Sequence, residues 1–295
     1  MKENKINNNN NKLSNITINT RKPRIGKKLW VYNIITMKLV NNKPYNSISE
    51  CNRDLNIERK TINKYINNNK IYKYKYIFSN KLLDNNILNQ YNINISDKAR
   101  QVIIGELLGD GHLHLADNNQ SARLEWAFSI KALPYVNYLK FNILKELCND
   151  TLPTPYPKDN PRHYWFSTKF RPDLLELHKK WYKYDNINNR YIKTLPDPLD
   201  ISPIALGHWL MGDGSYNNAV ILCTDIFTKD EVLKLINYLY YKYNLDSNLL
   251  VIKYKLNNNL IIRYRIRFRS NSTHKIRLLI KEHILPEFYY KLGIN

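Results

Sequence analysis

The sequence predicts an α+β fold in which one unit, α-β-β-α-β-β-α, occurs twice after a small helical module. Two observations predict the duplication. Two apolar helices end in the same tripeptide, Gly-Asp-Gly, at residues 109–111 and 212–214. Each tripeptide is followed by the same order of strand and helix signals, which is the mark of an internal repeat. A third observation, two short helical stretches over residues 47–66, predicts the module.

The composition changes along the chain and divides it into five expected segments. Residues 1–28 form a low-complexity tail with an unbroken run of Asn, which we expect to be disordered. Residues 29–79 form the module and residues 80–95 an Asn-rich linker. The two repeats occupy residues 96–195 and 196–295.

The module is expected to contain a hairpin over Leu29–Val40, two helices and a returning strand over Tyr74–Phe78. Ser47-Ile-Ser-Glu50 is a capping box that opens the first helix. A turn at residues 56–58 leads to a second helix over residues 59–66, whose basic residues are Arg59, Lys60 and Lys64. This pattern fits a helix-turn-helix, in which the second helix enters the major groove of DNA. A plain helical hairpin is the alternative.

In both repeats, a capped apolar helix comes first. Ser96 caps the helix that runs to Leu108, and Ser202-Pro203 opens the helix that runs to Met211. In the first repeat we expect strands at 112–115, 123–128, 154–156 and 163–169, with helices at 132–148 and 172–182. In the second we expect strands at 215–217, 219–225, 249–256 and 260–269, with helices at 228–243 and 272–284.

Basic residues alternate with apolar ones in the last two predicted strands. On a strand, alternate side chains share a face, so four arginines would form one row. These are Arg263, Arg265, Arg267 and Arg269. We expect an antiparallel partner strand to add Lys253 and Lys255 to the same basic face, with helices covering the apolar face. No acidic residue interleaves within either strand, and the whole chain carries a net charge of +21. Nucleic acid is therefore favoured over simple solvation of this face.

Each Gly-Asp-Gly places an aspartate, Asp110 or Asp213, at the C-terminal end of an apolar helix. The helix dipole is negative there, so a carboxylate needs a cation nearby. If the helices pack side by side, the two carboxylates meet and repel unless divalent cations lie between them. Mg²⁺ accepts such carboxylates together with phosphate oxygens and can promote displacement at phosphorus. A lone Asp before Gly is more often a turn residue, but two at equivalent positions of a repeat indicate catalysis.

These residues resemble a known family. Ile103-Ile-Gly-Glu-Leu-Leu-Gly-Asp-Gly111 and Leu206-Gly-His-Trp-Leu-Met-Gly-Asp-Gly214 are similar to the two signatures of LAGLIDADG homing endonucleases, and the resemblance covers residues 96–295. It implies a homing-endonuclease fold with two saddle-shaped antiparallel sheets that grip DNA. It also implies a monomer with pseudo-twofold symmetry that cuts both strands of a long, asymmetric site. Asp110 and Asp213 would bind Mg²⁺ (or Mn²⁺) and the scissile phosphates.

The resemblance extends to two further positions. Lys193 and Lys291 match lysines near the metals, which polarise water or stabilise the pentavalent phosphate; a plain surface charge is the alternative for either. Apart from these matches, we expect Arg123 and Lys169, in the predicted strands of the first repeat, to contact DNA. Residues 29–79 resemble the modular DNA-binding units appended to homing nucleases, which favours the helix-turn-helix.

The signatures also depart from the family pattern. Glu106 stands where an aliphatic residue is usual, and His208 and Trp209 replace smaller residues. We therefore expect an asymmetric helix interface in which Gly105 or Gly109 makes room.

Two other functions remain open from the sequence alone. The same scaffold resembles intron maturases, which bind intron RNA as splicing cofactors, and a DNA-binding regulator without catalysis is a third class. The three cysteines lack metal-ligand spacing, and no apolar run reaches the length that spans a bilayer. We therefore expect neither a zinc site nor a membrane partner. The abundance of Asn, Lys, Ile and Tyr, all with A/T-rich codons, suggests an organelle, and we expect the mitochondrion.

Overall fold

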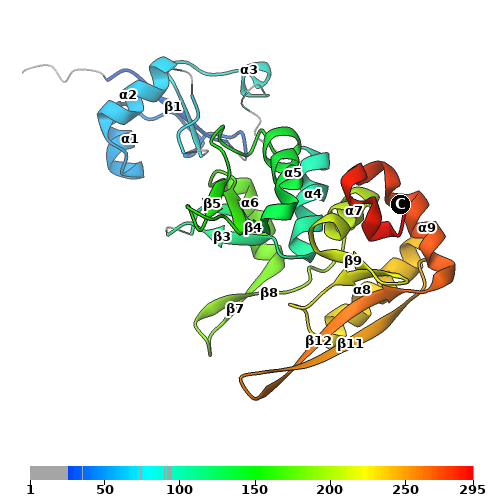
Figure 1. Ribbon diagram of the computed structural model, residues 1–295. Helices are drawn as coiled ribbons and strands as arrows, with labels where there is room; N and C mark the ends of the chain where they lie inside the picture. Colours follow the sequence, from blue (N-terminus) through cyan, green and yellow to red (C-terminus); the bar gives the residue numbers. More distant parts are fainter. Residues whose placement is uncertain are drawn as a thin grey trace, which may run out of the picture.

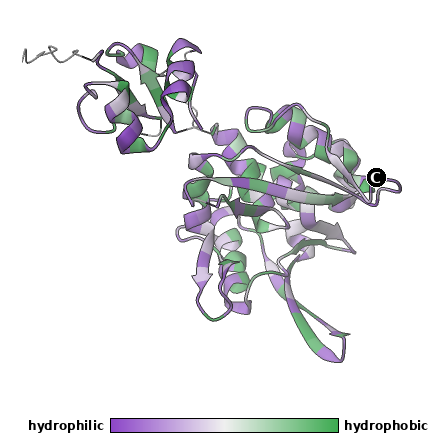
Figure 2. Cartoon of the chain, turned by 90° about the vertical axis from the view of Figure 1, so that its left-hand side faces the viewer, coloured by the Kyte–Doolittle hydropathy of each residue, from purple (hydrophilic) through white to green (hydrophobic). Residues whose placement is uncertain are grey.

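The computed structural model describes residues 26–294 apart from 35, 69, 74, 90, 92–94 and 118. Most of the predicted tail, and Tyr74 at the predicted start of the returning strand, therefore lie outside the described residues. The described chain forms a small N-terminal module and a larger duplicated body, each with its own apolar core (Figure 1). Figure 2 shows the same division, with apolar segments inside both bodies. Among the described helices, none combines the length and apolar character of a membrane span.

The module confirms the two predicted helices. Strand β1 (Trp30–Asn33) pairs antiparallel with β2 (Tyr76–Ser79), and α1 (Ile48–Leu55) and α2 (Arg59–Asn68) pack beside this pair. The Ser47 side chain accepts a hydrogen bond from the Glu50 amide at 3.1 Å, as the predicted cap requires. Asn56, in the left-handed conformation, ends α1, and the next residue, Ile57, is buried against both helices.

Two expectations for this region are modified. The hairpin over residues 29–40 is reduced to one bridge between Tyr32 and Leu39, because Met37 turns the chain with a positive φ of 53° and β1 takes β2 as its partner. A short helix, α3 (Asn85–Asn89), lies within the segment predicted as a linker.

The larger body repeats one topology. The first sheet has the order β3-β4-β6-β5, and the second has the order β9-β10-β12-β11, with every neighbouring pair antiparallel. The same order at equivalent places of the sequence confirms the predicted duplication. The elements of the first repeat are α4 (Asp97–Leu108), β3 (His112–Leu115), β4 (Ala122–Ser129), η1 (Ile130–Ala132), α5 (Leu133–Asn137), η2 (Tyr138–Ile143), β5 (Thr154–Tyr156), β6 (His163–Ser167) and α6 (Pro172–Trp181). Those of the second are α7 (Pro203–Asp213), β9 (Gly214–Tyr216), β10 (Val220–Cys223), α8 (Lys229–Tyr243), β11 (Ser247–Leu256), β12 (Asn259–Phe268), α9 (Ser270–Ile280), η3 (Lys281–His283) and η4 (Pro286–Leu292).

The first repeat differs from the expectation in two places. The helix predicted over 132–148 is broken into a 3₁₀ turn, a short α-helix and a π-helical turn, in which the Leu144 amide donates to the Leu139 carbonyl at 2.8 Å. This wider turn accompanies burial of Lys140, whose ammonium donates to Asn149 at 2.9 Å. After α6, strands β7 (Tyr182–Asp185) and β8 (Arg190–Lys193) form a hairpin that has no equivalent in the described part of the second repeat.

Helices α4 and α7 lie side by side at the centre of the body (Figure 1). Nearly every residue from Val102 to Leu108 in α4, and from Ala205 to Met211 in α7, is buried, because one helix face meets its own repeat and the other meets the partner helix. Gly105 makes the closest approach: a Cβ placed there would lie 2.3 Å from the Ala205 carbonyl oxygen. A side chain at this position would force the helices apart.

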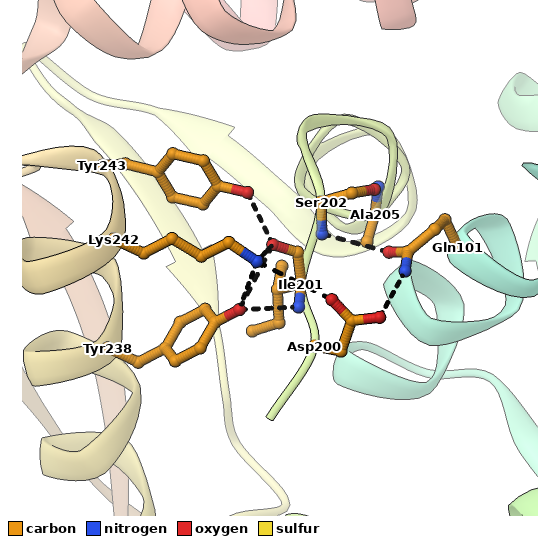
Figure 3. A network of polar contacts seen from close by, with 8 residues as sticks. All are labelled: Gln101, Asp200, Ile201, Ser202, Ala205, Tyr238, Lys242 and Tyr243. Atoms are coloured by element: carbon orange, nitrogen blue, oxygen red, sulfur yellow. Dashed lines mark hydrogen bonds and ion pairs between the residues drawn. The ribbon is translucent and has the colours of Figure 1, made fainter. Parts of the chain in front are cut away.

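A polar network holds the N-terminal ends of the two helices (Figure 3). Gln101 of α4 donates to Asp200 at 2.9 Å and accepts from the Ser202 amide at 3.0 Å. The Ile201 carbonyl oxygen, in the connection between the repeats, accepts from Lys242 of α8 at 3.0 Å. These contacts hold the start of α7 against both α4 and α8. Because α4 and α7 also pack along their length, the relative position of their C-terminal ends is set as well.

Candidate active site at the ends of two packed helices

The two predicted aspartates are brought together at the C-terminal ends of α4 and α7. Asp110 follows α4, and Asp213 is the last residue of α7. A Cβ placed on Gly109 would lie 2.9 Å from the Asp213 Cβ and 3.7 Å from its Oδ2. The glycine before one aspartate therefore makes room for the other, and each repeat contributes one carboxylate to a shared site.

The two carboxylates differ in environment. Asp110 is exposed, whereas Asp213 is half-buried. Burial first, and the nearby Asp110 carboxylate second, raise the pKa of Asp213 to about 7. A hydrogen bond from the Cys223 thiol and the positive charge of Lys291 oppose these effects on the same pKa. A cation placed beside the two carboxylates would therefore favour the ionised form of Asp213.

The two predicted lysines occupy matching places beside the aspartates. Lys193, at the end of β8, caps α4 by donating from Nζ to three carbonyl oxygens, those of Leu107 at 3.1 Å, Gly109 at 3.0 Å and Gly111 at 2.5 Å. Lys291, in η4, caps α7 by donating from Nζ to the Met211 carbonyl oxygen at 2.7 Å. Each repeat thus supplies an ammonium group to the end of its own signature helix, where the helix dipole is negative.

Burial changes the acidity of both lysines. It lowers the pKa of Lys193 to about 8, while the carboxylates of Asp110, Asp213 and Glu106 favour the charged form and raise it. Burial also lowers the pKa of Lys291, again opposed by Asp213. Both groups therefore release a proton more readily than a lysine in water.

A buried polar cluster between the helices was not anticipated as a unit. The Tyr135 hydroxyl donates to Glu106 and lies 2.8 Å from His208 Nδ1, which is 3.6 Å from Glu106 Oε1. All three side chains are buried. The sequence marked Glu106 and His208 as departures from the family pattern, but nothing local to Tyr135 in the sequence indicates that it links them.

A second feature absent from the sequence prediction is a pocket beside Asp110. It has a volume of about 340 Å³ and is lined largely by the β7–β8 hairpin, including Arg190 and Tyr191. Tyr182 orders one wall, because its hydroxyl accepts from the Leu113 amide at 2.9 Å and lies 3.2 Å from His112 Nδ1. The alternation of Tyr and basic residues on either side of an Asn-rich turn was the available signal for this hairpin.

The arginine row is present, but the predicted lysines are not part of it. In the β11–β12 ladder, Arg263 lies opposite Ile252, whereas Lys253 lies opposite Ile262 and Lys255 opposite Leu260. Directly paired residues share a face. The two lysines therefore lie on the face opposite the arginines, and the expectation of one face with all of these basic residues was wrong. The cause is the two-residue turn at Asn257 and Asn258, which pairs Leu256 with Asn259 and so sets odd-numbered residues opposite even-numbered ones.

An acidic residue also meets the row in space. Asp225, after β10, accepts two hydrogen bonds from Arg265 at 2.7 and 2.6 Å. Arg269 stands at the N-cap of α9, beyond the end of β12, where it donates to Asn248 at 2.9 Å. Arg263, Arg265 and Arg267 thus form the sheet-borne part of the row, and Arg269 lies at its edge.

The other predicted DNA contacts are distributed over two bodies. Arg123, on β4, forms an ion pair with Glu125 at 2.5 Å and lies over the Phe170 ring. Lys169 instead lines a pocket with Asn142 and Lys145, which follow or belong to the helical segment, and no residue of a described strand lines this pocket. In the module, three exposed residues lie along α2, namely Arg59, Lys60 and Lys64.

The fold and the site together define a class of protein: a duplicated nuclease-like scaffold in which two packed helices present one aspartate each between two antiparallel sheets. Residues 100–276 match the LAGLIDADG DNA endonuclease family, and this match covers more than half of the chain. The protein belongs to that family, which confirms the resemblance predicted from its two signatures. Residues 27–66 match the NUMOD1 domain, in agreement with the predicted N-terminal module.

Individual relatives agree with this assignment. The chain is 26% identical over 215 residues to DNA endonuclease I-ChuI of Chlamydomonas applanata, a match that covers 68% of this chain and 97% of the relative. It is 28% identical over 239 residues to cytochrome b mRNA maturase bI2 of Saccharomyces cerevisiae, covering 78% of this chain and 54% of the maturase. The chain thus spans about half the length of that maturase. The structure of the homing endonuclease I-WcaI bound to its DNA recognition sequence has the same fold, with a TM-score of 0.56, 24% identity, and coverage of 72% of this chain and 96% of that one.

Proposed function

We propose that this protein is a site-specific endonuclease that cuts both strands of a long, asymmetric DNA site, acting as a monomer with divalent metal ions. The observation that carries this proposal is the meeting of Asp110 and Asp213, one from each repeat, at the ends of α4 and α7. Each repeat offers one carboxylate, which could bind a metal ion, and one lysine. The pair of repeats could therefore serve the two phosphodiesters, one in each DNA strand. Membership of the endonuclease family supports the same conclusion.

The donor atoms of the site suit Mg²⁺ (or Mn²⁺). Asp110 is exposed and Asp213 is half-buried beside it, so both offer carboxylate oxygens at the negative ends of two helices. The described residues contain no group of three or more His, Cys, Asp or Glu side chains that could enclose a metal. A cation here would need phosphate oxygens of the substrate as further ligands, which is how Mg²⁺ binds at many phosphoryl-transfer sites. When bound, it would supply Lewis-acid stabilisation of charge on the scissile phosphate.

Lys193 and Lys291 would polarise a water molecule or stabilise negative charge on that phosphate. Their ammonium groups lie at the ends of α4 and α7, and the pKa of Lys193 is lowered to about 8 by burial. A general acid acts best when its pKa lies near the working pH. All three hydrogens of the Lys193 ammonium donate to carbonyl oxygens in this structure, so its positive charge would stabilise the phosphate. It would donate a proton to a departing oxygen, or orient a water molecule, only after releasing one of these carbonyls.

The two sheets and the module would share the binding of DNA. The half-buried arginines of β12 would hold one half-site through their accessible guanidinium edges, and the first sheet, with Arg123, would hold the other. Arg59, Lys60 and Lys64 of α2 would contact DNA beyond the sheets, as a basic recognition helix does. Lys253 and Lys255, on the opposite face of the hairpin, have no part in base contacts under this proposal. The composition supports a mitochondrial setting for the protein.

Cleavage of a defined DNA pool tests the proposal. The purified chain is incubated with a randomised double-stranded DNA library in Mg²⁺, in Mn²⁺ and in EDTA, and the cut ends are sequenced. We expect cutting of both strands within one long motif in either metal and none in EDTA. Absence of any metal-dependent cutting, in the presence of sequence-specific binding, would instead support a regulator without catalysis.

A second candidate function is the binding of intron RNA. It is favoured by the similarity to a protein named as a cytochrome b mRNA maturase, across 78% of this chain. Filter binding separates the two functions: a maturase binds a structured intron RNA at least as tightly as its duplex DNA site, whereas an endonuclease alone prefers the duplex.

A further inference from the structure

The guanidinium group of Arg265 is held in one orientation before any DNA binds. Its Nε donates to Asp225 Oδ1 at 2.7 Å, and its Nη2 donates to Asp225 Oδ2 at 2.6 Å. This bidentate contact occupies the Nε–Nη2 edge of the planar group. The hydrogens on Nη1 and the second hydrogen on Nη2 remain, and they form the donor fork that matches two adjacent acceptors.

The fork belongs to the face of the second sheet that adjoins the candidate active site. Arg265 pairs with Cys223 of β10, and the Cys223 thiol hydrogen-bonds Asp213. The side chain of Arg265 is 30% exposed, so the free edge of the guanidinium is accessible. A duplex lying on this face would present the base pairs nearest to the cleaved phosphates.

Asp225 changes what this arginine can bind. Its carboxylate neutralises the guanidinium and would repel a phosphate oxygen placed beside it. The O6 and N7 atoms of guanine are uncharged acceptors, and they match the free fork in the major groove. Arg263 lies on the same face but has no carboxylate partner within the described chain, and Arg267 contacts only the Asn217 carbonyl at 3.4 Å. These two arginines keep their full charge and suit phosphates.

The first sheet has no such group at the equivalent place. In the first repeat, Ala127 pairs with Trp165; in the second, the corresponding pair is Cys223 with Arg265. The correspondence follows from the residue two positions after each aspartate: His112 pairs with Glu125, and Ser215 pairs with Ile221. A tryptophan cannot form the two hydrogen bonds that a guanine edge offers. The first sheet does hold Arg123 against Glu125, but through Nε alone and at another position of the sheet, so the two half-sites still differ.

We propose that Arg265, oriented by Asp225, reads one guanine in the half-site bound by the second sheet, close to the cut. The inference rests on the proposed function, because it takes duplex DNA as the ligand. Arg265 is in this sense a specificity-determining residue, and Asp225 is the residue that positions it. Arg263 and Arg267 bind the backbone and contribute affinity without choosing a base.

Selection from a randomised duplex library tests the assignment. The full chain and its variants are used in EDTA, so that binding is measured without cutting. We expect the wild type to select a G·C pair at one position of one half-site, and Arg265→Met to lose that preference by about 5- to 150-fold. Arg263→Met is the matched control on the same face: it should weaken binding to all sequences and reduce the salt slope by about 1, with the base preferences unchanged.

A second variant addresses the role of Asp225. Asp225→Asn removes the negative charge but keeps an acceptor, so it should loosen the G·C preference and raise the affinity for unrelated DNA. Both side chains are about one-third exposed, so these replacements should fold, which circular dichroism verifies. The inference is overturned if Arg265→Met retains the base preference, or if it weakens all sequences equally as Arg263→Met does. If the wild type selects a site but never cuts it, the proposed function fails while this inference stands; if it selects none, both fail.

Discussion

Gly105 of α4 lies against the backbone of Ala205 in α7, so closely that a Cβ on Gly105 would stand 2.3 Å from the Ala205 carbonyl oxygen. The next turn of α4 brings Gly109 against Asp213 in the same way. The separation of the two helix axes therefore decides whether the carboxylates meet. The close packing at Gly105 and Gly109 is therefore required for the two aspartates to form one site.

Replacement of Gly105 by alanine should move α4 away from α7. The added methyl group meets backbone atoms, which cannot turn aside, so we expect a loss of about 1–3 kcal/mol in the free energy of unfolding and slower DNA cleavage. Gly212→Ala is the control, because its Cβ would lie 3.4 Å from the Glu106 carboxylate, an ordinary van der Waals distance. Urea unfolding of both variants checks the prediction, and equal stability of the two would contradict it.

Tyr135→Phe should destabilise the helix interface. The hydroxyl is the hydrogen-bond donor to buried Glu106 and lies against His208, so its loss leaves a buried carboxylate short of a partner. We expect a cost of about 1–3 kcal/mol. Tyr138→Phe is a matched control, since Tyr138 stacks on the same histidine ring but its hydroxyl makes no hydrogen bond among the described residues. Thermal unfolding measures the difference. Equal unfolding midpoints for the two variants would disprove the role of the Tyr135 hydroxyl.

Loss of either site lysine should slow DNA cleavage. Lys193→Met and Lys291→Met each remove an ammonium group from beside the aspartates, and a positioned proton donor typically contributes about 10²- to 10⁴-fold. Single-turnover cleavage at saturating protein measures the effect. Lys179→Met is the control, because Lys179 forms an exposed ion pair with Glu176 on α6. A wild-type rate in both site variants would remove the lysines from the mechanism.

Acid should destabilise the first repeat through His178. Burial first, and the nearby His112 second, lower the pKa of His178 to about 4. Above pH 6.5 the group is neutral in both states. As the pH falls from about 6.5 to about 4, the unfolded chain binds a proton that the folded chain does not, so stability falls in this window and not below it.

The urea midpoint at pH 7 and pH 5 measures this effect. His178→Gln should lose less stability between the two pH values than the wild type does. His274→Gln, at an exposed histidine of α9, should behave as the wild type. The same pH dependence in all three proteins would exclude His178 as the cause.

Much of the duplicated fold could be predicted because its signals are local. Three helix starts were marked by Ser96, Ser202 and Thr228, and each of these side chains accepts the expected backbone hydrogen bond. The two Gly-Asp-Gly motifs located both aspartates, because a repeat places equivalent residues at equivalent points of the fold. Alternation of Arg with apolar residues was enough to place three arginines on one face of β12.

The remaining features depend on contacts between distant parts of the chain. The predicted face of Lys253 was wrong, because the register between β11 and β12 depends on the turn at Asn257 and Asn258. Alternation within one strand does not determine that register. Tyr135 could not be linked to Glu106 because they meet only when the helices pack. The contact between Arg265 and Asp225 likewise joins β12 to the turn after β10, which are distant in the sequence.

The most direct test of the shared site is the replacement of each aspartate by asparagine, which keeps the shape of the side chain and removes its charge. Cleavage and binding of the same duplex are measured for Asp110→Asn, for Asp213→Asn and for Asp150→Asn, a control at an exposed residue that lines the pocket with Lys145. Stabilisation of charge by a bound metal is worth several kcal/mol, so each site variant should cut both strands at least about 100-fold more slowly while it binds DNA with nearly unchanged affinity. Cutting of both strands by Asp110→Asn at the wild-type rate would contradict the claim that the two repeats share one metal-dependent site.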